Sequence, residues 1–173
     1  IITNLSTTAA LDEVAKKYNC KVIRSAVGEI NVVNEMKKHN AHIGGEGNGG
    51  VILTESHLGR DAFVGAVIIL DLLASNKITM HEANQKIPKY YMLKEKVEIN
   101  PQINNHVISN RIKQAFNECE FDETDGIKVL DKHSWLHVRQ SNTEPIIRVY
   151  IESKQEEKLS EIFDKVKTIF NDS

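Results

Sequence analysis

The chain has 173 residues, a hydrophobic content of 40% and a formal net charge of −2. This length permits one large domain or two small ones, and the apolar content is sufficient for a packed core. The slightly acidic balance gives no general attraction to nucleic acid or to anionic membranes, so we expect neither as a partner. Cys20 and Cys119 lie far apart without a Cys-x-x-Cys pair, which indicates reduced thiols in a cytoplasmic protein.

The N-terminus carries no recognisable signal peptide, and the sequence begins with Ile1 instead of methionine. Because the first residues already have the character of a strand, we expect the chain to be part of a longer protein. The longest apolar stretch covers residues 62–74 and contains Asp71. It is too short to span a bilayer, so we expect a helix that is buried on most of its sides.

The first half of the sequence alternates between short strands and helices. Apolar residues at helical spacing predict the helices, and β-prone stretches predict the strands between them. Thr79 is expected to cap a short helix that ends before Pro88. The alternation predicts a layered α/β domain over residues 1–88. The other expected strands cover residues 1–4, 21–24, 42–43 and 51–53. The other expected helices are one that ends at residue 18 and two that cover residues 29–39 and 59–75.

The second half has a different rhythm, because strands outnumber helices. It predicts a small antiparallel sheet over residues 89–173, with both helices on one face and the opposite face open. Lys94 and Lys96 are expected to be solvated strand residues. The expected elements are a strand at 92–99, a helix around 103–116, strands at 127–130, 135–139 and 146–152, and a helix around 159–170.

Residues 44–50 form a glycine-rich loop in the first half. Five of the nine glycines of the chain stand in this loop, around Glu46 and Asn48. Glycine at this density lets the backbone approach a ligand closely. A carboxylate accepts hydrogen bonds from sugar hydroxyls, and an amide both donates and accepts them. We therefore interpret Gly45, Glu46, Gly47 and Asn48 as a sugar-binding loop, with a flexible turn as the alternative.

Two arginines and three small polar residues surround a turn in the second half. Arg139 and Arg148 flank this turn, and strand parity puts both on the face opposite the apolar side chains. The guanidinium group matches the oxygens of a phosphate, and Ser141, Asn142 and Thr143 add further donors. We interpret the turn as a phosphate-binding loop. The alternative is a polar hairpin whose arginines are only solvated.

Both loops resemble motifs of the α-D-phosphohexomutases. Residues 139–149 match the family's phosphate-binding pattern R-x-S-G/N-T-E-P-x-x-R-V, with Asn142 where most members carry glycine. Residues 45–49 match its sugar-recognition pattern G-E-x-S/N-G, with Asn48 in place of the commoner serine. Gly28 lies in a turn that is similar to one of the same family domain. The sequence leaves open whether His57 or Arg60 contributes to the site.

The resemblance implies the C-terminal part of a phosphoglucomutase, phosphomannomutase or phosphoglucosamine mutase, comprising most of the third domain and all of the fourth. Such isomerases interconvert hexose 1-phosphates and hexose 6-phosphates through a phosphoserine and a bisphosphorylated sugar. The sequence contains neither a serine in the family's T-A-S-H-N-P setting nor a D-x-D-x-D segment. We therefore expect the phosphoserine and the Mg²⁺ site in the missing first and second domains, and an inactive fragment.

The expected partners are a hexose phosphate, a hexose 1,6-bisphosphate activator and the remaining N-terminal domains of the same enzyme. We expect no metal site within this chain, because His133 and His137 show no ligand spacing with a cysteine. The alternative function is a sugar-phosphate binding module without chemistry. Glucose, mannose and glucosamine are not distinguished, since Glu46 can serve all three.

Overall fold

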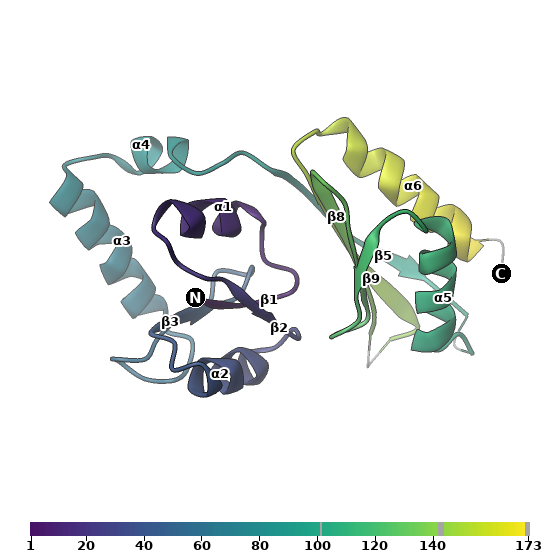
Figure 1. The fold of residues 1–173 in the computed structure, drawn as a ribbon, viewed down its shortest axis with the longest axis horizontal. Helices are drawn as coiled ribbons and strands as arrows, with labels where there is room; N and C mark the ends of the chain where they lie inside the picture. Colours follow the sequence, from purple (N-terminus) through teal and green to yellow (C-terminus); the bar gives the residue numbers. More distant parts are fainter. Residues whose placement is uncertain (101, 142–143, 172–173) are drawn as a thin grey trace. The chain divides into compact units, whose positions relative to one another are not determined.

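The computed structural model describes residues 1–100, 102–141 and 144–171. It divides into two compact units, Ile1–Lys89 and Tyr90–Ser173, each with its own sheet and helices (Figure 1). Asn142 and Thr143 of the expected phosphate-binding loop lie outside the described residues.

The N-terminal unit consists of β1 (Ile2–Asn4), α1 (Ala10–Lys17), β2 (Ile23–Ser25), α2 (Glu29–Lys38), β3 (Ile43–Gly45), β4 (Val51–Leu53), α3 (Ala62–Asn76) and α4 (Met80–Gln85). Its sheet has the order β2-β1-β3-β4, in which β1 runs parallel to β2 and β3, and β4 runs antiparallel to β3. Parallel neighbours need crossover connections, and α1 and α2 supply them. The layered α/β architecture expected from the sequence is confirmed.

Helix α2 packs on the sheet of this unit. Gly44 on β3 permits the close approach, because a Cβ atom at this position would lie 2.4 Å from Met36 Sδ. Contact of this kind stabilises the fold through burial of apolar surface. The core consists of side chains from α2 and the strands, namely Ile2, Val32, Val33, Met36 and Ile52.

Side-chain caps fix the starts of the last two helices of this unit. The Oγ1 atom of Thr79 accepts a hydrogen bond from Glu82 N at 3.2 Å, and Thr79 N donates to Glu82 Oε2 at 2.7 Å. This is a capping box, and it confirms the cap expected at Thr79. Asp61 caps α3 by accepting a hydrogen bond from Phe63 N at 2.8 Å, so that helix begins after Asp61 and not at residue 59.

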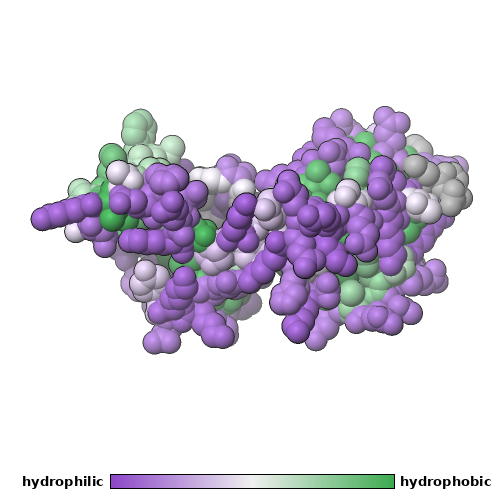
Figure 2. Space-filling model, turned by 90° about the horizontal axis from the view of Figure 1, so that it is seen from above, coloured by the Kyte–Doolittle hydropathy of each residue, from purple (hydrophilic) through white to green (hydrophobic). Residues whose placement is uncertain are grey.

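The expectation that α3 is a buried helix is wrong for the described chain. Phe63 is 85% exposed, and Val67 and Leu70 are each 64% exposed. Among the residues of α3 only Gly65 is buried, where the helix packs against Val51 of β4. Figure 2 shows hydrophobic residues at the surface on the left of the view, within the N-terminal unit. A helix that is apolar on every side is typically covered by neighbouring elements on several sides. Among the described residues, the neighbours of α3 lie on the side that faces β4.

The C-terminal unit consists of β5 (Tyr91–Glu98), α5 (Asn105–Ala115), β6 (Glu120–Asp122), β7 (Ile127–Leu130), β8 (Ser134–Gln140), β9 (Ile146–Ser153) and α6 (Glu157–Asn171). Its described strands form an antiparallel sheet of order β5-β9-β8-β7-β6. The sequence did not predict β6, because three residues are too few to show a strand period. The expected antiparallel sheet is otherwise confirmed.

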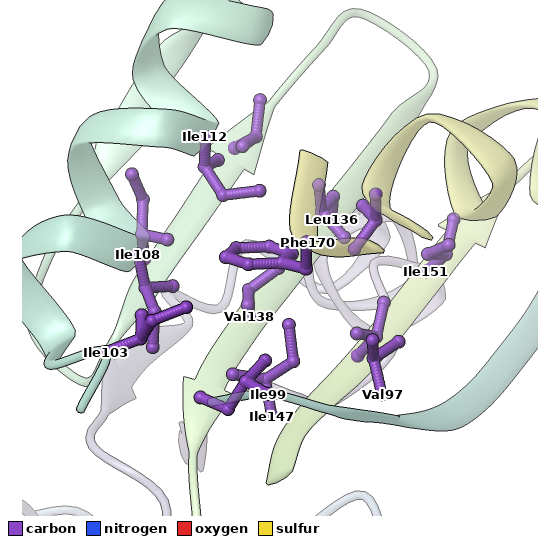
Figure 3. Close-up of a cluster of buried hydrophobic side chains, with 14 residues drawn as sticks. Val97, Ile99, Ile103, Ile108, Ile112, Leu136, Val138, Ile147, Ile151 and Phe170 are labelled. Atoms are coloured by element: carbon purple, nitrogen blue, oxygen red, sulfur yellow. The ribbon is translucent and has the colours of Figure 1, made fainter. Parts of the chain in front are cut away.

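Helices α5 and α6 cover one face of this sheet, as expected (Figure 3). Ile108 and Ile112 of α5 and Phe170 of α6 point into the same cluster as the apolar side chains of the strands. The strand residues of this apolar cluster alternate along their strands, which confirms the predicted parity. They are Val97, Ile127, Val129, Leu136, Val138, Ile147, Val149 and Ile151.

The opposite face of the sheet is not open at its centre, contrary to expectation. Trp135, His137, Glu152 and Lys128 are all buried. They bond partly to one another: Trp135 Nε1 donates a hydrogen bond to Glu152 Oε2 at 2.7 Å, and Lys128 Nζ lies 4.1 Å from the centroid of the Trp135 ring. Neighbouring polar partners allow such side chains to be buried.

Candidate functional site

The glycine-rich loop of the N-terminal unit is a tight connection between β3 and β4. Glu46 N donates to Gly50 O at 2.9 Å, and Gly49 N donates to Glu46 O at 3.0 Å. Side chains have no room at two of its positions: a Cβ at Gly45 would lie 2.5 Å from Gly50 O, and one at Gly47 would lie 3.1 Å from Ser6 O. The glycines therefore shape a closed turn around Glu46.

The side chain of Glu46 points inward, with only 4% of its surface exposed. Its Oε1 atom accepts hydrogen bonds from Asn4 Nδ2 at 3.0 Å and from Gly28 N at 3.2 Å. Gly28 has a φ of 122°, which favours glycine and aims its N–H group at the carboxylate. Sequence analysis noted the turn at Gly28 but missed Asn4, because nothing in the pattern links the end of β1 to this loop.

The second oxygen of Glu46 faces Arg60. Arg60 Nη1 lies 3.4 Å from Glu46 Oε2, and Asn48 Nδ2 donates to the same oxygen at 3.5 Å. Arg60 also donates from Nε to Glu29 Oε2 at 2.7 Å. Glu29 raises the pKa of Arg60 through this hydrogen bond, and its own pKa is lowered by hydrogen bonds from the backbone and side chain of Arg60. A hollow of about 490 Å³ lies beside Arg60 and Asn48; Glu29, Gly50 and Asp61 also line it, whereas Glu46 does not.

His57 occupies a different position. Its Nδ1 atom lies 3.8 Å from Asp61 Oδ2, its ring is 52% exposed, and it does not line the hollow beside Asn48. Of the two residues left open by the sequence, the structure thus brings Arg60 to the carboxylate of Glu46 and leaves His57 beside Asp61.

The expected phosphate-binding loop of the C-terminal unit connects β8 and β9. Ser141 N donates to Ile146 O at 2.9 Å, and Pro145 O accepts a hydrogen bond from Ile99 N at 3.1 Å, so the base of the loop is fixed on both sides. Arg139 and Arg148 are direct cross-strand partners in the register of β8 and β9. Partners of this kind share a face, so the structure brings the two arginines together as predicted from parity.

Asp125 lies next to the first arginine. Its Oδ2 atom is 3.3 Å from Arg139 Nε, at an angle that makes an ion pair without a hydrogen bond. Gly126 carries the chain past this point with a φ of 68°, and a Cβ there would lie 2.4 Å from Val138 O. Arg148 forms no ion pair with any described carboxylate. No local sequence pattern links Asp125 to Arg139, so this contact was not predicted.

His137 stands on the same face as the arginines and is fully buried. Its Nε2 atom lies 2.6 Å from Asp125 O, and because a carbonyl only accepts, this nitrogen carries the proton. Burial lowers the pKa of His137, an effect that hydrogen bonding to Asp125 partly opposes. The ring is therefore neutral near pH 7.

The described residues do not provide a metal site or a membrane span. Within residues 1–100, 102–141 and 144–171, no group of three or more His, Cys, Asp or Glu side chains is placed to hold a metal ion. No helix in that part of the chain has the length and apolar character needed to cross a membrane. The Mg²⁺ expected for the family thus finds no fitting ligands among these residues.

Two family models match this chain. One describes the α/β/α domain III of phosphoglucomutase/phosphomannomutase and covers residues 1–91, and the other describes its C-terminal domain and covers residues 91–169. A phosphoglucomutase/phosphomannomutase of Thermococcus kodakarensis is 35% identical over 95% of this chain and 36% of its own length. A phosphoglucosamine/phosphogalactosamine mutase of Sulfurisphaera tokodaii is 31% identical over 98% of this chain and 38% of its own length. The chain therefore spans little more than a third of these relatives.

Solved structures share the fold at low identity. A phosphoglucomutase/phosphomannomutase family protein from Burkholderia thailandensis superposes with a TM-score of 0.80 at 19% identity, over 97% of this chain and 36% of its own. N-acetylphosphoglucosamine mutase of Aspergillus fumigatus, in complex with GlcNAc-6P and magnesium, gives a TM-score of 0.70 at 12% identity, over 97% of this chain and 40% of its own. At such identities the likeness concerns the fold.

Proposed function

Because the chain belongs to the phosphoglucomutase/phosphomannomutase family, we propose that it is the substrate-binding C-terminal part of a phosphohexomutase. The complete enzyme would interconvert hexose 1-phosphates and hexose 6-phosphates of glucose, mannose or glucosamine through a phosphoserine and a bisphosphorylated sugar. The observation that carries the proposal is the pairing of Arg139 with Arg148 at the root of the β8–β9 loop. Two guanidinium groups on one face suit the oxygens of a phosphate group.

The glycine-rich loop supports recognition of the sugar. Gly45 and Gly47 would let the backbone come close to a sugar, and Asn48 offers an amide for hydrogen bonding. The Oε2 atom of Glu46 faces Arg60, with which it makes a long contact of 3.4 Å. A carboxylate oxygen in this position can accept a hydrogen bond from a ring hydroxyl. The negative charge of Glu46 disfavours contact with the phosphate itself, so the two loops have separate tasks.

The residues of this chain would contribute positioning, not group transfer. Arg139, Ser141 and Arg148, with Asn142 and Thr143, would hold one phosphate, while Glu46 and Asn48 orient the ring. Holding the reacting oxygen in line with a phosphoryl donor lowers the entropic part of the barrier. The phosphoserine and the magnesium site would belong to other parts of the enzyme, and a hexose 1,6-bisphosphate would act as activator.

The exposed stripe of α3 supports the proposal that other domains of the same enzyme pack on the N-terminal unit. Phe63, Val67 and Leu70 follow the spacing of one helix face and are all highly exposed. Large contiguous apolar surface on a domain marks an interaction site. Relatives are almost three times as long as this chain, so the remaining domains are the partner that we propose for this surface.

Substitution of the arginines in the full-length enzyme tests the proposed phosphate grip. We expect Arg148→Ala and Arg139→Ala each to raise KM for glucose 1-phosphate about 10- to 100-fold, since a charge-assisted hydrogen bond contributes roughly 1.5–3 kcal/mol. Lys132→Ala removes an exposed cation of the same unit and should leave KM unchanged. Unaltered KM in both arginine variants would refute the assignment.

A further inference from the structure

The strand register places three cationic residues in one row across the C-terminal sheet. Arg139 on β8 faces Arg148 on β9, and Arg148 faces Lys96 on β5. Directly opposite residues of antiparallel strands point to the same side, with their Cβ atoms roughly 5 Å apart. The row therefore extends from the two arginines of the proposed phosphate grip to Lys96. Sequence analysis had read Lys96 as a solvated strand residue.

The described carboxylates neutralise only a small part of this row. Asp125 pairs with Arg139, whereas neither Arg148 nor Lys96 forms an ion pair with any described carboxylate. Glu98 follows Lys96 on the same side of β5, yet no ion pair joins them. Like charges that face each other across strands repel. An anion bound between them would remove this repulsion.

The charge of the row matches a phosphate group. Three cations and one paired carboxylate leave a surplus of two positive charges. A phosphate monoester carries about −1.5 to −2 at pH 7. The guanidinium groups fix the orientation of the phosphate through their planar forks, while an ammonium group on a flexible stem adds charge without a fixed geometry.

We propose that Lys96 is a third phosphate-binding residue, which contacts the phosphate of the substrate together with Arg139 and Arg148. This inference rests on the proposed function, because it extends the same site. It assigns a role to β5, a strand that neither loop motif includes and that lies more than forty positions before Arg139 in the chain.

Calorimetric titration of the full-length protein with glucose 6-phosphate and with inorganic phosphate tests this role. We expect Lys96→Gln to lower the affinity for both ligands roughly 5- to 20-fold, because one charge-assisted contact is lost. Lys96→Arg should restore most of the affinity. Lys94→Gln is the matched control, because Lys94 lies on the same side of β5 but faces Tyr150 instead of Arg148. Its affinity should equal that of the wild type, and all variants should keep the wild-type melting temperature.

Three results would overturn the inference. Unchanged affinity in Lys96→Gln, with weakened binding in Arg148→Ala, would exclude Lys96 and leave the proposed function intact. An equal loss of affinity in Lys94→Gln would show that the effect of Lys96→Gln comes from the general surface charge and not from a contact with the phosphate. Unchanged affinity in Lys96→Gln and in Arg148→Ala would remove the phosphate grip itself.

Discussion

Glu46 uses its two carboxylate oxygens for different purposes. Oε1 accepts hydrogen bonds from Asn4 Nδ2 and Gly28 N, which fill the two lone pairs of that oxygen. Among the described residues, Oε2 has the longer contacts to Arg60 and Asn48, at 3.4 and 3.5 Å. One oxygen therefore ties the loop to the rest of the unit, and the other is the one that can accept from a sugar hydroxyl.

Substituting Glu46 by glutamine separates sugar binding from phosphate binding. In the full-length protein we expect Glu46→Gln to lower the affinity for glucose 6-phosphate about 10-fold, since an amide oxygen is a weaker acceptor than a carboxylate. Binding of inorganic phosphate should stay unchanged, because the arginines lie in the other unit. Calorimetry with the two ligands measures both effects.

Glu29→Gln provides the matched control for this experiment. The Glu29 carboxylate also bonds to Arg60, but it is the Glu46 carboxylate that accepts the hydrogen bonds from Asn4 and Gly28. If Glu46 acts by binding the sugar, Glu29→Gln should retain most of the affinity for glucose 6-phosphate. Equal losses for phosphate and sugar phosphate in Glu46→Gln would instead indicate that Glu46 only holds the fold.

His137 is the buried titratable residue of the C-terminal unit with a depressed pKa. Burial disfavours the charged ring, Lys128 and Arg139 add repulsion, and the contact to Asp125 opposes both only in part. In the unfolded chain the ring of His137 takes up a proton near pH 6.5, whereas in the folded chain this ring stays neutral down to a lower pH. The unfolded state then binds more protons, so the free energy of unfolding falls as the pH drops through this window.

This linkage predicts that the C-terminal unit is more stable at about pH 7.5 than at about pH 6. Urea unfolding followed by the fluorescence of Trp135, the single tryptophan, reports on this unit. His137→Gln should flatten the difference between the two pH values. His133→Gln, at an exposed histidine of the same unit, should preserve it. The same slope in His137→Gln as in wild type would contradict the assignment.

At the level of the elements, α3 shows most clearly how context decides burial. Its sequence is apolar on every side, with Asp71 as the one charged residue. In the described chain it packs on β4 and leaves Phe63, Val67 and Leu70 to solvent. The pattern predicted a helix buried on most of its sides, and this prediction is wrong for the described residues. Within the N-terminal unit, the described residues cover this helix on one side only.

The double substitution Val67→Gln and Leu70→Gln tests this view of α3. In the 173-residue chain we expect weaker binding of a hydrophobic dye and a free energy of unfolding within about 0.5 kcal/mol of wild type, because both residues are exposed. In the full-length enzyme the same change should destabilise by several times this amount, since polar groups would then be buried without partners.

Ile30→Gln serves as the control for α3, because Ile30 is a single exposed apolar residue on α2 with the same exposure of 64%. This substitution should leave the free energy of unfolding nearly unchanged in both the 173-residue chain and the full-length enzyme. A double α3 variant that is equally neutral in the full-length enzyme would mean that no other domain covers this helix.

The sheets show which elements the sequence could predict. Long periodic stretches such as α5 and β9 were predicted with errors of one or two residues, because their apolar faces repeat several times. The short strand β6 was missed, since Glu120-Phe121-Asp122 gains its identity only by pairing with β7. The buried polar face around Trp135 and Glu152 was also missed, because polar residues on a strand predict exposure.

At the scale of the whole molecule, we propose that the parts needed for phosphoryl transfer belong to other domains of the enzyme. The chain spans 36% of the Thermococcus relative, and neither its sequence nor its described residues offer the serine loop or a metal site. We expect the purified 173-residue chain to show no conversion of glucose 1-phosphate into glucose 6-phosphate in a coupled assay. The full-length protein should show it. Turnover by the short chain would contradict the proposed division of labour, and an inactive full-length protein would favour a binding module without chemistry.

The sequence by itself determined the class of the two folds, and it is the source of the chemistry that we propose for the two loops. Glycines around a carboxylate, arginines around a turn, and the periods of strands and helices are all local, so they can be read along the chain. The tertiary structure decided which distant residues join them. Crossover connections bring Asn4 and Gly28 to Glu46, and strand register brings Lys96 to Arg148. No local pattern encodes these meetings, because they depend on how strands pair and in which register.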